Sequence, residues 1–232
     1  VYPFTLKNGM LKTHEKRYNS DIKSWNGEAN FYYTFNDSSQ LDTKIYYYYS
    51  QRGLPGVVVL YNSDANERLW DENFFAQSSY KKRLSDKWEL RAHLKYDHSW
   101  NRYEDVNVKY TDNKQIDVDR QDEYYGSATI GWHPIHNLSI SLAQDLAVNS
   151  LRNNINLSPN PLRFSSLTAM SAQLQLGRLA LNGNLVNTYI TESVSNGDKP
   201  DDRKRLSPSL SLSYRLLKDE ALYVRTSYKS TF

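Results

Sequence analysis

The stretch Trp88–Asn101, WELRAHLKYDHSWN, decides the fold, because its apolar and polar residues alternate one by one. The even positions carry Trp88, Leu90, Ala92, Leu94, Tyr96, His98 and Trp100, and the odd positions carry Glu89, Arg91, His93, Lys95, Asp97, Ser99 and Asn101. Only His98 breaks the separation. Successive side chains of a β-strand point to opposite faces, so this stretch predicts a long strand with one apolar and one charged face.

The same alternation recurs along the chain and predicts about ten strands. Apolar residues alternate with serines in Leu206–Arg215, for example, and with polar residues in Leu138–Ala143. The best helical candidate, 167–176, still keeps the strand period. A further N-terminal hairpin would turn at Asn8-Gly9, a strong turn signal. The expected strands are 24–36, 41–51, 70–84, 88–102, 119–132, 138–149, 163–176, 179–193, 206–217 and 221–232.

The connections between these strands alternate between short and long. Short polar turns are expected at 36–40, 85–87, 133–137, 177–178 and 218–220, and long connections at 52–69, 103–118, 150–162 and 195–205. Strands of globular proteins are usually about 5–6 residues long, whereas crossing an outer membrane takes about 9–11 residues. Long strands with short turns at one end and long loops at the other indicate a transmembrane β-barrel.

Composition agrees with this interpretation. The 232 residues have a mean hydropathy of −0.75 and no apolar run near the roughly 20 residues of a membrane helix, which excludes a helical membrane protein. A barrel is polar on average, because only every second residue faces lipid. The absence of cysteine excludes disulfides and thiolate metal sites. The net charge of +3 argues against nucleic-acid binding. The chain begins at Val1 without an export signal, so we expect a processed protein or a fragment.

The aromatic residues lie near the expected strand ends, as they do in the interface girdles of membrane barrels. Those expected beside the short turns are Phe35, Trp88, Trp132 and Tyr214, and those expected toward the long loops are Tyr49, Phe74, Trp100, Tyr124 and Tyr228.

Alternation also predicts which residues share a face. One face, in contact with lipid, should carry Trp88, Leu90, Ala92, Leu94, Leu138, Ile140, Leu142, Leu210, Leu212 and Val224. The opposite face, toward a polar lumen, should carry Arg91, Lys95, Ser139, Ser211 and Arg225. A shift of one residue in the pairing would invert a whole strand.

Three segments resemble TonB-dependent outer-membrane receptors: Gln51–Gly56 (QRGLPG), Glu67–Phe75 (ERLWDENFF) and the last strand, Leu222–Phe232 (LYVRTSYKSTF). The resemblance extends over the whole chain at the level of strands and loops. It implies active import of a scarce nutrient across the outer membrane of a Gram-negative bacterium. The import would be powered by the TonB complex acting through an N-terminal plug and a TonB box.

Neither a plug nor a TonB box is found in the sequence, and plugged barrels have about 22 strands. We therefore expect residues 1–232 to be a partial receptor barrel domain. The expected fold is all-β, an antiparallel up-and-down meander of about ten long strands. It would form roughly half of a large transmembrane barrel and would not close, leaving free edges near 24–36 and 222–232. Such a fragment should aggregate, pair edge to edge or need detergent.

Substrate contacts are expected in the outer loops, which carry binding residues in such folds. The candidates are Arg52, Tyr61, Arg68, Trp70, Trp100 and Tyr103, although anchoring at the interface or loop packing explains each of them equally well. Iron chelates such as siderophores, corrinoids, glycans and peptides all stay open as cargo. The expected partners are outer-membrane lipid, a small nutrient and the TonB complex.

No cofactor, metal or catalytic site is expected. Asp117, Asp119 and Asp122 could bind calcium, but a solvated loop junction is the favoured explanation. His133 and His136 are too close together and too turn-like for a zinc site. Nucleophile elbows, phosphate-binding loops and dinucleotide fingerprints do not occur, so we expect no enzyme. The alternative function is a soluble or surface-attached β-rich binding module for a glycan or a protein.

Overall fold

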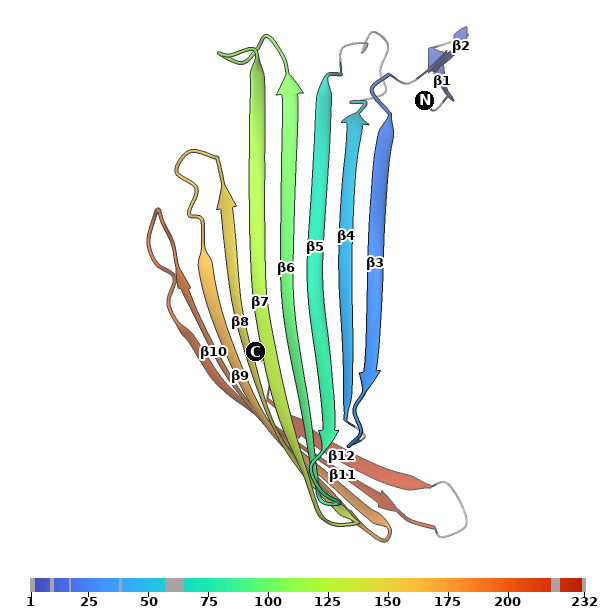
Figure 1. The fold of residues 1–232 in the computed structure, drawn as a ribbon, viewed down its shortest axis with the longest axis vertical. Coiled ribbons are helices and arrows are strands. Elements are labelled where there is room, and N and C mark those ends of the chain that lie inside the picture. Colours follow the sequence, from blue (N-terminus) through green and yellow to red (C-terminus); the bar gives the residue numbers. More distant parts are fainter. Residues whose placement is uncertain are drawn as a thin grey trace.

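The computed structural model describes residues 3–8, 11–16, 18–37, 39–56, 65–217 and 222–230. Every regular element in this part of the chain is a β-strand (Figure 1). The strands are β1 (Pro3–Asn8), β2 (Leu11–Lys16), β3 (Ile22–Thr34), β4 (Gln40–Leu54), β5 (Glu67–Arg83), β6 (Trp88–Val106), β7 (Lys114–Ile135), β8 (Leu138–Asn153), β9 (Leu162–Leu176), β10 (Leu179–Ser193), β11 (Arg203–Arg215) and β12 (Tyr223–Lys229).

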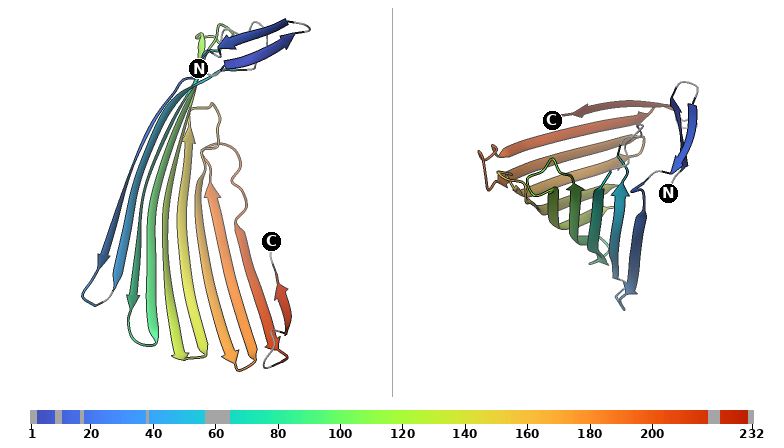
Figure 2. Two further views of the ribbon diagram at one scale, coloured as in Figure 1. Left: turned by 90° about the vertical axis from the view of Figure 1, so that its right-hand side faces the viewer. Right: turned by 90° about the horizontal axis from the view of Figure 1, so that it is seen from above.

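The strands β3 to β12 form one antiparallel sheet in which each strand pairs with its neighbours in sequence. The sheet curves into an open trough, which is clearest from above (Figure 2). β3 and β12 are its two edges and do not pair with each other. The structure thus confirms the predicted open, up-and-down meander of ten strands.

A separate hairpin precedes this sheet. β1 pairs with β2, and Asn8 lies opposite Leu11. The predicted N-terminal hairpin is therefore confirmed. Gly9, to which we assigned part of its turn, lies outside the described residues.

Several strands extend beyond their predicted ends, mostly toward the long connections. β7 also continues to Ile135, so the predicted short turn 133–137 is wrong over its first three residues. β10 has the predicted bounds, but β6 continues to Val106 and β7 begins at Lys114. The predicted loop 103–118 is therefore wrong over much of its length, and 107–113 remain between the strands. The outer ends of these strands are polar on both faces, so no alternation marks them in the sequence. Backbone hydrogen bonds extend the pairing regardless of side-chain polarity.

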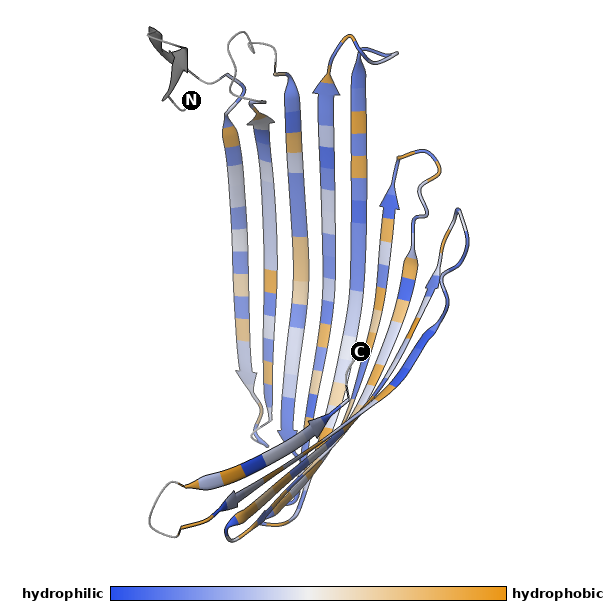
Figure 3. Cartoon of the chain, turned by 180° about the vertical axis from the view of Figure 1, so that it is seen from behind, coloured by the Kyte–Doolittle hydropathy of each residue, from blue (hydrophilic) through white to orange (hydrophobic). Residues whose placement is uncertain are grey.

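The pairing register places the predicted sets of residues on two opposite faces. Directly opposite residues of antiparallel strands share a face. One row of opposite residues joins Leu90, Ile130, Leu142, Met170 and Leu185. The neighbouring row on the other face joins Arg91, Thr129, Ala143, Ala169 and Val186. We call these the apolar face and the polar face, and Figure 3 shows their alternation along the strands.

The sheet has no second layer to cover it. No hydrophobic residue is buried in the described part of the chain, and large apolar side chains of the apolar face stay open. Leu94 is 67% exposed and Leu142 is 52% exposed. A search of the same residues for a helix long and apolar enough to span a membrane finds none.

Aromatic side chains of the apolar face gather in two places. The inner aromatic cluster, beside the short turns, contains Trp88 stacked on Trp132 with ring centroids 5.6 Å apart. The outer aromatic cluster contains Tyr96 with Tyr124 at 4.9 Å, and Trp25 with Tyr47 at 4.7 Å. Trp88 and Tyr96 are eight residues apart on β6, or about 27 Å along the strand.

Tyr228, predicted toward the long loops, is the last residue but one of β12 and lies opposite Leu210 of β11. The hydrogen-bonded rows climb from β4 toward β12 because the strands are tilted. Position within one strand is therefore a poor guide to height in the sheet.

Candidate functional site

The polar face carries a network of charged side chains that join neighbouring strands. Lys44 Nζ lies 2.9 Å from Glu28 Oε2, which links β4 to β3. Lys95 Nζ lies 3.2 Å from Asp97 Oδ2 and 3.3 Å from Glu123 Oε1, which links β6 to β7. Such partly exposed pairs stabilise the sheet only slightly, by about 0–1 kcal/mol each. Their main consequence is a hydrophilic wall with fixed charges.

Aromatic rings interrupt this charged wall. Tyr46 on β4 stacks against Phe75 on β5 with centroids 5.2 Å apart, and Lys44 Nζ lies 5.8 Å from the Phe75 centroid. Both rings belong to the polar face, opposite Glu28 and Asp97. An aromatic platform bordered by charges can stack a flat ligand while polar groups bind its edges.

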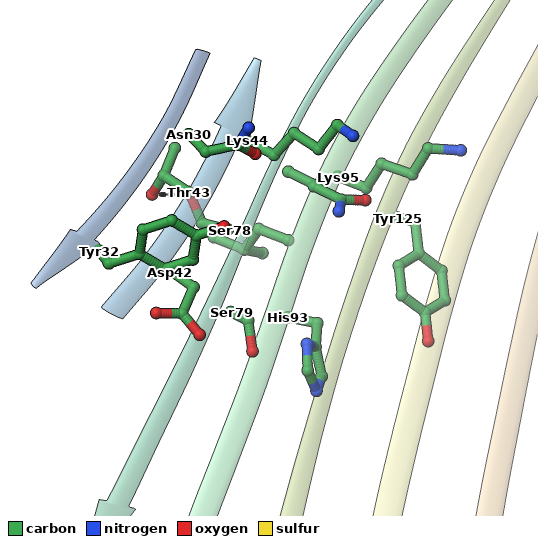
Figure 4. Close-up of a pocket in the computed structure, with 12 residues that line it drawn as sticks. Asn30, Tyr32, Asp42, Thr43, Lys44, Ser78, Ser79, His93, Lys95 and Tyr125 are labelled. Atoms are coloured by element: carbon green, nitrogen blue, oxygen red, sulfur yellow. Dashed lines mark hydrogen bonds between the residues drawn. The ribbon is translucent and has the colours of Figure 1, made fainter. Parts of the chain in front are cut away.

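A hollow of about 370 Å³ lies next to this platform, across β3 to β7 (Figure 4). Its polar-face lining combines cations, a carboxylate, a histidine and neutral hydrogen-bonding groups. These residues are Asn30, Tyr32, Asp42, Lys44, Gln77, Ser79, His93, Lys95 and Tyr125. The arrangement can hold a polar small molecule by hydrogen bonds and ring contacts. Ser79 and His93 lie opposite each other in register, but no hydrogen bond joins their side chains.

The six sequence candidates do not form one site. Arg52 and Tyr103 lie on the polar face, where they belong to one hydrogen-bonded row with Leu69. Arg52 Nη2 lies 2.9 Å from Asp71 Oδ2, and Asn101 donates to Asp71 at 2.6 Å. Burial raises the pKa of the Tyr103 phenol. This outer part of the polar face lies above the hollow and shares its polarity.

The other described candidates lie on the apolar side of the strands. Trp70 packs under the guanidinium of Arg102 at 5.0 Å, and Trp100 lies opposite Arg120. Arg68 pairs with Asp21, with Nη2 and Oδ2 2.8 Å apart. These three candidates therefore point away from Arg52 and Tyr103. Tyr61 lies outside the described residues.

The segment 51–56 has a structural role at the outer end of the sheet, where the long connections begin. The Asn19 amide donates to the backbone carbonyls of Leu54 (3.1 Å) and Glu67 (2.6 Å), and the Gly53 N–H donates to the Asp21 carbonyl at 2.9 Å. A Cβ on Gly53 would lie 2.2 Å from Asn19 Oδ1, so only glycine fits. The hydrogen bond from Arg68 lowers the pKa of the Asp21 carboxyl. We call Asn19, Asp21, Gly53 and Arg68 the outer clasp.

The possible metal ligands are not brought together. Asp117 and Asp119 lie on the polar face, whereas Asp122 lies on the apolar face and accepts from His98 and Tyr96 at 2.8 and 2.9 Å. His93 and His98 are on opposite faces, as predicted. The described residues contain no group of three or more metal-ligating side chains.

Sequence reasoning assigned Lys95 to the polar face but proposed neither Lys95 nor Lys44 as a ligand contact. It missed His93, Gln77 and Tyr125 as their neighbours in the hollow. The available signal was the odd or even position of each residue along its strand, because that position decides which face the side chain is on. It would also have separated Arg52 and Tyr103 from Trp70 and Trp100.

No protein-family model and no curated protein matches this chain. Solved structures do match its fold. The FrpB iron transporter of Neisseria meningitidis (F3-3 variant) gives a TM-score of 0.70 at 12% identity, over 90% of this chain and 36% of that one. Its F5-1 variant, in the apoprotein form, gives 0.65 at 10% identity over 84% and 34%.

The ferric citrate transporter FecA in its unliganded form gives a TM-score of 0.59 at 11% identity, covering 93% of this chain and 37% of FecA. This chain thus spans about a third of the length of these solved structures. At such low identity the likeness concerns the fold: the ten-stranded sheet has the fold of part of these transporters.

Proposed function

We propose that this chain forms part of the wall of a TonB-dependent outer-membrane receptor that imports a scarce nutrient into a Gram-negative bacterium. The observation that carries the proposal is the exposed apolar face of a sheet without a buried hydrophobic core. A soluble sandwich would bury that face against a second sheet. In a membrane the surrounding lipid takes this place.

The two aromatic clusters support the same proposal. They lie about 27 Å apart along β6, which a strand tilt near 40° reduces to a height of about 20 Å. Trp100 lies two residues beyond His98 on the same face of β6 and extends the outer aromatic cluster outward. Together these rings bracket the apolar band of about 25 Å found in outer-membrane barrels.

In this proposal the polar face lines the lumen, and the hollow between β3 and β7 contributes to the path or binding site of the cargo. The similar solved structures are iron transporters rather than enzymes, which favours a transport function. A ferric siderophore, a corrinoid or a glycan would fit a wall of charges and aromatic rings. A plug, the TonB complex and the remaining strands belong to the proposed full-length receptor.

Membrane insertion is tested by spin labels on the full-length protein in liposomes. Labels at Leu90, Leu94, Leu210 and Leu212 should be accessible to lipid-soluble oxygen and shielded from a water-soluble nickel chelate. Labels at Arg91, Lys95 and Ser211 should show the reverse. If the leucine sites prove shielded from both reagents, they are packed between protein layers, and the soluble binding module becomes the better explanation.

Transport is tested by deleting the gene and supplying iron chelates, corrinoids, glycans and peptides one at a time at limiting concentration. Slow growth on one nutrient, restored by the wild-type gene, identifies the cargo. Normal growth on every one of them would contradict import.

A further inference from the structure

A second hollow lies on the apolar face, across β5 to β9, and has a volume of about 580 Å³. Its walls are almost entirely apolar: Leu94, Tyr96, Tyr124, Leu146, Val148 and Phe164. Gly126 lies between Leu94 and Leu146 in the same hydrogen-bonded row, so its missing side chain leaves the space open. A Cβ at Gly126 would lie 3.3 Å from Leu94 Cδ2. We call this the apolar groove.

Two arginines lie directly opposite each other just outside the groove. Arg120 on β7 pairs in register with Arg152 on β8. Like charges in this position repel each other, which destabilises the pair of strands unless an anion compensates. The Arg152 side chain is 71% exposed. The Arg120 side chain makes no ion pair or hydrogen bond with another described residue.

The carboxylates near the two arginines do not neutralise both of them. Asp122 Oδ2 lies 3.3 Å from Arg152 Nη2, but Asp122 also accepts hydrogen bonds from Tyr96 and His98. Glu72 on β5 is opposite Trp100 on β6, which is in turn opposite Arg120 on β7. Glu72 is therefore two strands away from Arg120. Arg120 therefore keeps an uncompensated positive charge on the side of the sheet that carries the groove.

The distance between the groove and the two arginines matches the distance between the acyl chains and the headgroup phosphate of a lipid. Tyr124 and Arg120 are four residues apart on the same face of β7, which is about 13 Å along the strand. The groove includes Tyr96 and Tyr124 of the outer aromatic cluster, and the arginines lie farther out, beside Trp100. Acyl chains occupy the first environment of a bilayer, and headgroup phosphates occupy the second.

We propose that this surface binds a lipid of the outer leaflet through a phosphate-bearing headgroup. One acyl chain lies in the apolar groove, and the phosphate lies between Arg120 and Arg152, where it receives charge-assisted hydrogen bonds. The proposal rests on the proposed function for the placement of the apolar face in a membrane. It adds a specific lipid site to one sector of the wall, β5 to β9.

The test measures lipid binding to the purified full-length receptor by native mass spectrometry. The probes are bisphosphorylated lipid A and the same lipid with both phosphates removed. The wild type should retain the phosphorylated lipid preferentially. The double variant Arg120→Gln/Arg152→Gln should weaken that binding about tenfold and leave binding of the dephosphorylated lipid unchanged. Inorganic phosphate at millimolar concentration should not displace the lipid.

Two further variants isolate the two parts of the site. Arg91→Gln removes a charge from the polar face and should leave binding of both lipids unchanged. Gly126→Leu fills the groove and should weaken binding of both lipids. Far-ultraviolet circular dichroism and heat-modifiable electrophoretic mobility confirm that each variant is folded.

Equal retention of the two lipids by the wild type would overturn the proposal, and so would an equal loss in Arg91→Gln and in the double variant. These results differ from a failure of the proposed function. Leucine labels that prove shielded from oxygen would contradict the membrane wall itself. Oxygen-accessible labels without a phosphate preference would contradict the lipid site alone.

Discussion

The inner band of the sheet and the outer ends of β5 to β7 share one backbone ladder but differ in their side chains. The pairing of β6 with β7 continues without a shift from Trp88 opposite Trp132 to Val106 opposite Lys114. In the inner band the two faces differ sharply in polarity. In the outer ends both faces carry charges, among them Arg52 with Asp71 on one face and Arg68 with Asp21 on the other.

The comparison separates two sources of stability. In the inner band one face is apolar and, in the proposed membrane wall, contacts lipid, so a charge placed in its middle is costly. In the outer ends cross-strand ion pairs, a cation–π contact between Arg102 and Trp70, and the outer clasp hold the strands together in water. The following predictions test that difference.

The largest effect is expected for a charge placed on the apolar face. Leu142→Arg should destabilise the full-length protein in liposomes by about 2–4 kcal/mol, because an arginine would face the middle of the bilayer. The measurement is urea-induced unfolding followed by tryptophan fluorescence. Ala143→Arg, one residue later and on the polar face, is the matched control and should change stability little. Equal losses in both variants would contradict the difference between the faces.

The next effect concerns the outer clasp. Gly53→Ala should cost about 1–3 kcal/mol, because its Cβ would overlap the side chain and the backbone carbonyl of Asn19. The loss should appear as faster hydrogen exchange of the Gly53 amide, which donates to Asp21. Gly27→Ala is the control, since a Cβ there meets nothing within 4 Å. Unchanged exchange in Gly53→Ala would argue that the clasp is loose.

A smaller effect is expected in the inner aromatic cluster. A double-mutant cycle with Trp88→Ala and Trp132→Ala should give a coupling energy of about 0.5–1.5 kcal/mol, since the stacked rings contact each other directly. Urea unfolding in liposomes provides the four stabilities. A coupling energy of zero would mean that each ring interacts with lipid independently of the other.

The smallest effect is a local pH response in the loop between β6 and β7. Asp105 is 4% exposed and pairs with Lys109 at 3.0 Å. It also accepts from Tyr110 at 2.8 Å. The hydrogen bonds from Lys109 and then Tyr110 lower the Asp105 pKa below its ordinary value of 3.8. The stabilisation is therefore complete above about pH 4 and is lost as the pH falls through the lowered pKa.

A spin label at Val108, which is 89% exposed, measures this response. Its mobility should stay constant at neutral pH and rise in acid. In Asp105→Asn the label should be mobile at every pH. A mobility in wild type that does not change down to pH 2 would contradict the role of the carboxylate.

The sequence allowed the fold to be predicted wherever one face is apolar. All ten strands were located, and β10 had the predicted ends. Prediction failed at Tyr103, which lies inside β6 rather than in a loop, because its neighbourhood is polar on both faces. The hydrophobic pattern within one strand does not show how far the neighbouring strand continues to pair with it. The long outer ends therefore required the structure.

The candidate site was predicted less well, because residue type alone selected the candidates. Arg68 and Trp70 have the chemistry of ligand contacts but belong to the outer clasp and to a cation–π pair on the apolar side. The hollow at Lys44 and Lys95 depends on neighbours from five strands. Sequence spacing within one strand cannot reveal such neighbours, which only the pairing register brings together.

In the proposed barrel, the climb of the hydrogen-bonded rows sets the width of the lumen. The row that starts at Gln40, the first residue of β4, reaches Val186, the eighth residue of β10. Seven residues of stagger over six strand spacings correspond to a tilt of about 40°. At that tilt ten strands cover about 60 Å of perimeter, more than the about 50 Å of a closed eight-stranded barrel. Because β3 and β12 still do not meet, the proposed barrel would enclose a lumen wider than that of the smallest barrels.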